Sequence, residues 1–174
     1  MPDPAALRGL HPRRPRRPRR RGRAVARRAG LHVLHLIAPA PLLPALAAHV
    51  EAAYPHEACG LIGARDRRYT VRPALNLRPA AEAHAAFELD PAALIACRRA
   101  GEEVAALYHS HCDAPATLSA ADRAAALIDG RPAWPGVELW VLEVRRGRLV
   151  ACARYRFDPA RGDFARVDDV SEDR

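Results

Sequence analysis

Apolar residues recur at helical spacing in three parts of the chain. In residues 41–54, leucine, alanine and valine fall on one side of an expected helix, and the prolines lie near its start. A second helix is expected from Asp90, a suitable N-cap followed by proline, to Gly101. A third is expected in residues 118–130, where a terminal glycine closes it. The pattern thus predicts three helices spread along the chain.

Short apolar runs and alternating stretches between these helices predict strands. The expected strands are residues 31–37, 57–64, 67–77, 103–111, 137–144 and 148–158. Helices and strands are interleaved, and the last two strands are separated only by a tight turn. This order predicts an α/β fold, with a single domain in which helices flank a mixed β-sheet.

The formal charge of +8 comes from the first part of the 174-residue chain. Residues 1–30 hold eleven arginines and one acid, and the remaining 17 basic and 19 acidic residues nearly balance. A segment of this composition repels itself and cannot bury apolar surface, so we expect disorder. It can contact nucleic acid or anionic lipid weakly through charge, but no aromatic residue is interleaved for base stacking. We therefore expect a disordered tail (1–30), a folded domain (31–160) and a polar C-terminal tail (161–174).

Residues 27–48 superficially resemble a secretory signal, with basic residues before apolar ones. Histidines and prolines interrupt the apolar part, and no run reaches the roughly 18 residues of a spanning helix. The four cysteines are widely spaced and include no Cys-x-x-Cys pair. These features predict a cytoplasmic protein without membrane contact.

Two histidines at the end of one expected strand are candidate metal ligands. Side chains on a strand alternate between faces, so His109 and His111 leave the same face. Asp122, on the next helix, can add an oxygen, which leaves a fourth zinc position for water. Each half of the pattern also has a structural interpretation. The histidines can be a solvated strand end, and Ser119 with Asp122 fits a helix-capping box.

The complete pattern is more specific than its halves. The order His-x-His, seven residues, then Ser-x-x-Asp resembles the signature of the JAMM (MPN+, JAB-domain) metalloproteases, whose layout is broadly similar to that of cytidine deaminases. The upstream "EACGLIG", the middle segment "LNLRPAAEAHAAFELDPAAL" and the later "WPGVELWVLEV" resemble further blocks of that family. The resemblance covers about residues 31–157.

This resemblance implies a role for each matching residue. His109, His111 and Asp122 match the ligands of one zinc ion per chain. Glu57 matches the general acid/base, and Ser119 matches the residue that stabilises the oxyanion. Elementary chemistry agrees, because a carboxylate can move a proton from water to a leaving amine and a hydroxyl can bond developing charge.

The sequence departs from common relatives at Cys112 and Leu118, which follow the second histidine and precede the serine. The Cys112 side chain is expected on the opposite strand face from His111. Whether this thiol influences the metal stays open.

The implied activity is zinc-dependent hydrolysis of an amide bond after the C-terminal glycine of a ubiquitin-like protein. The compact chain favours a small sulfur-carrier protein as substrate. Residues 78–89 are expected beside the groove, where they can pair with the carrier's tail as an added strand. The alternative is a non-catalytic MPN-type scaffold. A nucleic-acid-binding protein is disfavoured by the nearly neutral body. A zinc deaminase is disfavoured because no Pro-Cys-x-x-Cys is present.

Overall fold

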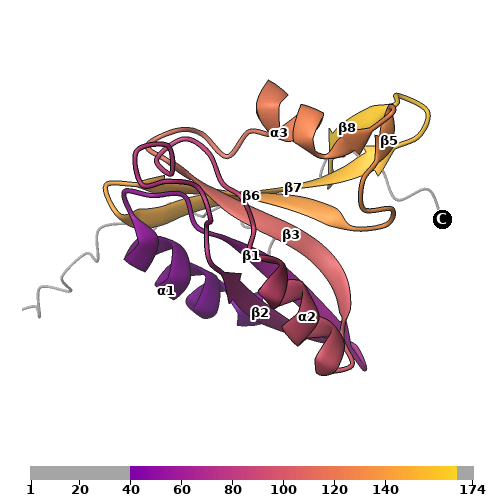
Figure 1. The fold of residues 1–174 in the computed structure, drawn as a ribbon, viewed down its shortest axis with the longest axis horizontal. Coiled ribbons are helices and arrows are strands. Elements are labelled where there is room, and N and C mark those ends of the chain that lie inside the picture. Colours follow the sequence, from indigo (N-terminus) through magenta and orange to yellow (C-terminus); the bar gives the residue numbers. More distant parts are fainter. Residues whose placement is uncertain (1–39, 168–174) are drawn as a thin grey trace, which may run out of the picture. The chain divides into compact units, whose positions relative to one another are not determined.

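The computed structural model describes residues 40–167. Within this range the chain forms a six-stranded sheet (Figure 1). Its strands, in sheet order, are β2 (Arg68–Ala74), β1 (Cys59–Arg65), β3 (Glu103–Cys112), β6 (Glu138–Arg145), β7 (Arg148–Asp158) and β8 (Asp163–Arg166). The helices are a 3-10 turn (Ala40–Leu42), α1 (Leu43–Ala53), α2 (Pro91–Arg99) and α3 (Ala120–Ala125).

The sheet is mixed, as expected for the predicted α/β fold. Strands β3 and β6 run parallel, and every other neighbouring pair is antiparallel. A parallel pair needs a long crossover, and residues 113–137 provide it. The mixed sheet with helices confirms the fold class. The Arg-rich tail (1–30) and the expected strand at 31–37 lie outside the described residues.

Helix α1 covers one face of the sheet. Its Leu46 and Val50 are fully buried and pack with Tyr108 and Trp140, which project from β3 and β6. Burial of each such aliphatic side chain contributes about 1.5–3 kcal/mol. Gly60 on β1 lies opposite Tyr108, and a side chain there would collide with the phenol ring. This apolar layer leaves the other face of β3 free for polar chemistry.

Helix α2 lies on the opposite face, which is also the face of the two histidines. Its Ala93 and Cys97 pack against Leu61 of β1 and Leu107 of β3. Leu107 precedes His109 by two residues, so the two side chains leave the strand on the same side. Asp90 caps this helix, because its carboxylate accepts a hydrogen bond of 2.8 Å from the Ala92 amide.

The structure corrects the extent of the third helix. Helix α3 ends at Ala125, and a small hairpin of β4 (Leu127–Ile128) and β5 (Arg131–Pro132) replaces the helix predicted up to Gly130. Asp129 and Gly130 have positive φ angles of 50° and 73°, which suit a hairpin turn and end a helix. The helix buries no residue, whereas Leu127 of the hairpin packs against an apolar cluster. Tertiary packing therefore outweighs the helical spacing.

The structure also places a strand within the segment 161–174, which was expected to be a polar tail. Strand β8 pairs with β7 along the sheet edge. Phe164 and Ala165 are buried there, and the Phe164 ring contacts the Phe157 ring with centroids 5.5 Å apart. The expected boundary at residue 160 is therefore too early. No helix within residues 40–167 is long and apolar enough to span a bilayer.

Candidate metal centre

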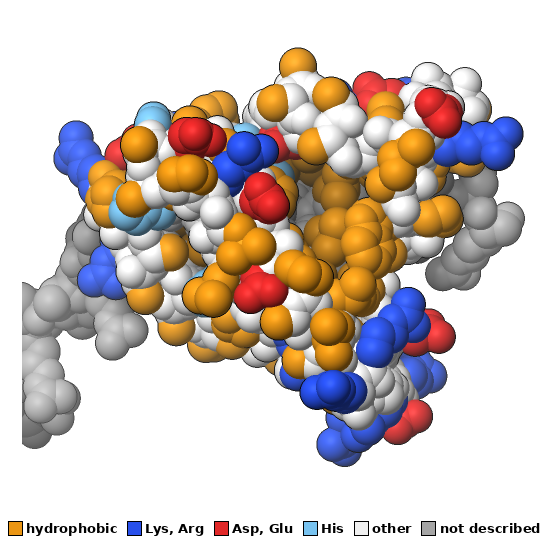
Figure 2. Space-filling view, viewed as in Figure 1, with side chains coloured by type: hydrophobic (Ala, Val, Ile, Leu, Met, Phe, Trp, Pro, Cys, Tyr) orange, Lys and Arg blue, Asp and Glu red, His pale blue; other side chains and the backbone are white. Residues whose placement is uncertain are grey.

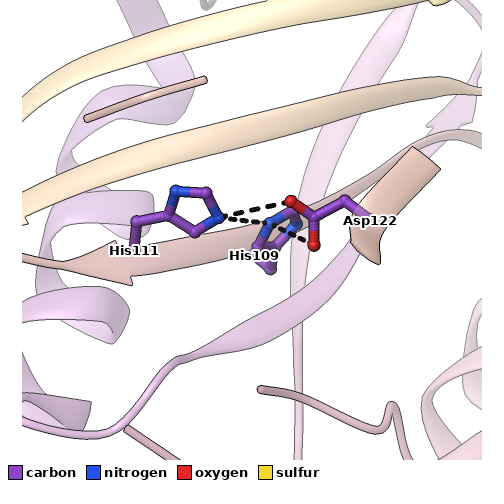
Figure 3. Close-up of side chains that lie close together, drawn as sticks. All are labelled: His109, His111 and Asp122. Carbon is purple, nitrogen blue, oxygen red and sulfur yellow. Dashed lines mark hydrogen bonds and ion pairs between the residues drawn. The ribbon is translucent and has the colours of Figure 1, made fainter. Parts of the chain in front are cut away.

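His109 and His111 converge at the end of β3. Their Nε2 atoms lie 3.1 Å apart, and Figure 3 shows both rings turned toward the Asp122 carboxylate. Backbone pairing of β3 with β1 on one side and β6 on the other holds this strand end in place. The alternation of side chains that the sequence suggested is therefore realised on a rigid central strand.

Asp122 reaches the histidines from the first turn of α3. Its Oδ1 lies 3.5 Å from His109 Nε2, and its Oδ2 lies 3.4 Å from His111 Nε2. The carboxylate is oriented by a capping box, in which Oδ2 accepts from the Ser119 amide at 2.8 Å while Ser119 Oγ accepts from the Asp122 amide at 3.1 Å. The capping and metal-binding interpretations are thus compatible, because one box aims the carboxylate.

The spacing of these three side chains fits a zinc ion. Ligand atoms bound at about 2.0–2.1 Å with tetrahedral angles lie roughly 3.3 Å from each other. The observed separations are 3.1, 3.4 and 3.5 Å. Among the described residues, His109, His111 and Asp122 form a group whose ligand atoms all lie within 4.8 Å of one another. Two nitrogens and one oxygen leave a fourth position for water.

Neighbouring groups fix the orientation of each imidazole. His111 Nδ1 lies 2.9 Å from the Pro115 carbonyl oxygen, which can only accept, so Nδ1 carries the proton and Nε2 has its lone pair free. The Phe87 ring stacks on His109, with centroids 4.5 Å apart and an interplanar angle of 20°. Both rings are therefore held with Nε2 toward the centre.

The charges around the centre favour a cation. Burial lowers the pKa of His109 and thus favours its neutral form. Burial also tends to lower the pKa of His111, but its contacts with Asp122 and the Pro115 carbonyl outweigh this and raise it. For Asp122, burial acts to raise the pKa, and the contacts with His109 and His111 prevail and hold it well below its ordinary range. A permanently ionised carboxylate beside imidazole lone pairs is a donor set for a metal ion.

Glu57 lies across from His111, two residues before β1 begins. The pairing of Cys59 with His109 and the hydrogen bond from the Ser110 amide to the Ala58 carbonyl extend the antiparallel register to Glu57 and His111. Glu57 is only 7% exposed, and burial raises its pKa to about 7. A carboxyl group with a pKa near 7 is suited to accept and return a proton at neutral pH.

Ser119 lies at the entrance of α3 and is exposed. Its oxygen accepts from the Asp122 amide, and its hydroxyl proton can still be donated to another acceptor.

The Cys112 side chain lies on the same face of β3 as Ser110, which is the face opposite His111, as the alternation of side chains predicts. Burial raises the pKa of its thiol to about 11, which makes it a weak nucleophile at neutral pH.

A cavity of about 820 Å³ connects these residues. Glu57, His109, His111, Ser119 and Asp122 all line it. Most of its other wall is apolar, and Figure 2 shows a hollow with apolar side chains opening beneath α3 in that view. The segment 84–89 forms part of this wall, which agrees with the expectation that residues 78–89 lie near the groove.

Two side chains that sequence reasoning did not single out organise this cavity. Phe87 stacks on His109 as described. Asn76 donates to the Glu57 carbonyl at 3.0 Å and to the Ala86 carbonyl at 3.1 Å, and its Oδ1 accepts from the Glu88 amide at 3.0 Å. Asn76 thereby joins the backbone of Glu57 to the cavity wall. Phe87 and Asn76 both lie in the middle segment that resembles the family, and this resemblance was the signal in the sequence for their roles.

Comparison with known proteins identifies the family. A family profile described as "Prokaryotic homologs of the JAB domain" matches residues 39–159. A comparison with curated proteins found no match.

Two solved structures share the fold. A solution structure of a protein from Salinibacter ruber is 29% identical, with a TM-score of 0.54, covering 78% of this chain and 90% of that one. A solution structure of a protein from Desulfitobacterium hafniense is 24% identical, with a TM-score of 0.57, covering 73% and 86%. Together with the profile match over most of its length, this shows that the chain belongs to the prokaryotic homologues of the JAB domain.

Proposed function

We propose that this protein is a zinc-dependent peptidase or isopeptidase of the JAMM type. The observation that carries the proposal is the convergence of His109, His111 and Asp122 in one cavity with Glu57. The JAB family includes hydrolases and non-catalytic members, and a scaffold has no need for a buried carboxyl group with a raised pKa beside three ligands. The single cluster in the described part of the chain corresponds to one zinc per chain.

The chain's own residues perform the proton transfers of this reaction. Zinc held by the three ligands would lower the pKa of a water molecule to about 7 and polarise the substrate carbonyl. Glu57 takes one proton from the attacking water onto its carboxylate. It then delivers this proton to the nitrogen of the scissile amide, which leaves as an amine. Ser119 donates its hydroxyl proton to a hydrogen bond with the carbonyl oxygen as negative charge develops there.

We propose the C-terminal tail of a small ubiquitin-like sulfur-carrier protein as the substrate, cleaved after its terminal glycine. The cavity supports this choice because the segment 84–89 lines it and its mostly apolar wall can accept an extended chain. Backbone groups near this segment can pair with such a tail as an added strand. We place the reaction in the reducing cytoplasm, because no disulfide joins the cysteines of the described residues.

The test uses zinc-loaded full-length protein and small ubiquitin-like carriers ending in Gly-Gly, each followed by a short C-terminal extension. Mass spectrometry should show cleavage directly after the second glycine. The matched controls are a carrier with that glycine changed to proline and enzyme stripped of zinc by a chelator. Absence of cleavage by fully zinc-loaded protein on every carrier would favour the non-catalytic scaffold instead.

A further inference from the structure

His111 depends on a loop that has no regular secondary structure. Residues 113–119 connect β3 to α3, and the Pro115 carbonyl in this loop accepts the hydrogen bond from His111 Nδ1. A carbonyl in an irregular loop can orient an imidazole only if its peptide plane is held. The Thr117 amide donates to this carbonyl at 2.7 Å, and a group that holds the Ala116 N–H would fix the other end of the same peptide.

Glu143 supplies that group from the neighbouring strand. In the parallel pairing of β3 with β6, Glu143 lies beside His111. Its Oε2 accepts a hydrogen bond of 3.1 Å from the Ala116 amide, and its other oxygen is paired with Arg145. The Glu143 side chain is 13% exposed, so the contact is largely shielded from water. A carboxylate on β6 thus contacts the loop directly after Pro115.

The two hydrogen bonds use the two ends of one peptide unit. The Ala116 amide and the Pro115 carbonyl belong to the same planar group, so holding the N–H also sets the direction of the C=O. A carboxylate that accepts from the N–H polarises the peptide and makes its carbonyl a stronger acceptor. A stronger bond at Nδ1 makes the Nε2 lone pair of His111 more basic toward a metal.

We propose that Glu143 is a positioning residue of the metal centre, acting on His111 through the Pro115–Ala116 peptide. The chain of contacts runs from the Glu143 carboxylate to the Ala116 N–H, and from the Pro115 carbonyl to His111 Nδ1. The inference rests on the metal centre of the proposed function and not on the peptidase reaction. Its readout is therefore metal affinity, without any substrate.

Tyr155 offers a matched control in the same loop. Its hydroxyl donates to the Ala116 carbonyl at 3.1 Å, which belongs to the following peptide unit. Tyr155→Phe removes one anchor of the loop but keeps the bond of the Ala116 amide to Glu143 and the bonds of the Pro115 carbonyl to His111 and the Thr117 amide. A general anchoring role for Glu143 predicts similar effects of the two variants, whereas the relay predicts that only Glu143 affects the metal.

The experiment measures zinc affinity of full-length variants by competition with a chromophoric chelator, with cobalt absorption as a second readout. Glu143→Ala should bind zinc about 10- to 100-fold more weakly. Glu143→Gln should recover most of this loss, since its amide oxygen still accepts from Ala116. Tyr155→Phe should keep wild-type affinity. Wild-type affinity in Glu143→Ala, or equal losses in Glu143→Ala and Tyr155→Phe, would overturn the proposal.

A nitrogen-15 NMR measurement covers the case in which Glu143→Ala does not fold. In Glu143→Gln the neutral acceptor should shift both the Ala116 amide and the His111 Nδ1–H signals, because the two are linked through one peptide. Unchanged His111 signals alongside a shifted Ala116 signal would overturn the relay. If the wild-type protein itself binds no zinc, the proposed function fails first, and the two failures are thereby distinguished.

Discussion

Phe87 and His109 form a stacked pair although they lie on segments far apart in the sequence. The phenyl ring covers one side of a candidate zinc ligand and also forms part of the cavity wall. It therefore restrains the imidazole and shapes the cavity of the candidate site.

Replacing the Phe87 ring should weaken both the binding of zinc and the binding of substrate. Phe87→Ala removes the stacking contact, so His109 gains rotational freedom, and we expect several-fold weaker zinc binding and a higher KM. Chelator competition and steady-state kinetics at saturating zinc measure the two effects separately. Phe157→Ala is the control, because that aromatic ring packs at the β7–β8 edge instead. Equal zinc affinity in wild type and Phe87→Ala would contradict the restraining role.

Removal of one imidazole should abolish tight zinc binding. His109→Ala deletes a ligand from the set of three, and the remaining two are not expected to hold zinc through gel filtration. Elemental analysis should find close to one zinc per wild-type chain and almost none in the variant. His56→Ala is the control, since His56 is exposed. Full zinc content in His109→Ala would remove this residue from the ligand set.

The proton-transfer role of Glu57 separates activity from metal content. Glu57→Gln keeps the shape of the side chain but cannot accept a proton, so hydrolysis should fall about 100-fold or more. Zinc content should stay close to one per chain, because Glu57 is not among the three converging ligands. A variant that hydrolyses the carrier at the wild-type rate would exclude Glu57 from the mechanism.

The same substitution should stabilise the metal-free protein at neutral pH. Burial raises the pKa of Glu57 from 4.5 to about 7, so the folded state favours the protonated form. The protonated Glu57 side chain contributes fully to the free energy of unfolding below pH 4.5, and this contribution is lost as the pH rises to about 7. Metal-free Glu57→Gln should exceed wild type by up to roughly 3 kcal/mol at pH 8 and match it near pH 4. Denaturant unfolding at both pH values checks this, and a pH-independent difference would contradict it.

The Arg-rich tail should be dispensable for catalysis. The family match begins at residue 39, and every candidate site residue follows it. Deletion of residues 1–30 should therefore leave the kcat/KM on a small carrier within about twofold of wild type. The assay is repeated at low and high salt, because a binding role of the arginines would be salt-dependent. A large loss at low salt that disappears at high salt would show that the tail binds substrate.

Local patterns in the sequence predicted much of this protein. The His-x-His spacing places two imidazoles on one strand face because side chains alternate with period two. Ser119 and Asp122 were predicted at the start of a helix, where they form the capping box. The resemblance to the JAB-domain family is confirmed by the family match, and the α/β fold with a mixed sheet by the observed strand order.

Other features depended on contacts between distant segments. Phe87, Asn76 and Glu143 have no local pattern that assigns them to the centre, because their roles arise from strand register and loop packing. The predicted helix at 118–130 was too long because Leu127 pairs in a hairpin and packs there against an apolar cluster. The segment 161–174 contains a strand because its backbone pairs with the edge of β7 and its Phe164 ring packs against Phe157. The spacing of nearby residues determines the local conformation and the face of a strand or helix on which each side chain lies. Burial and pairing with distant segments arise only when the chain has folded.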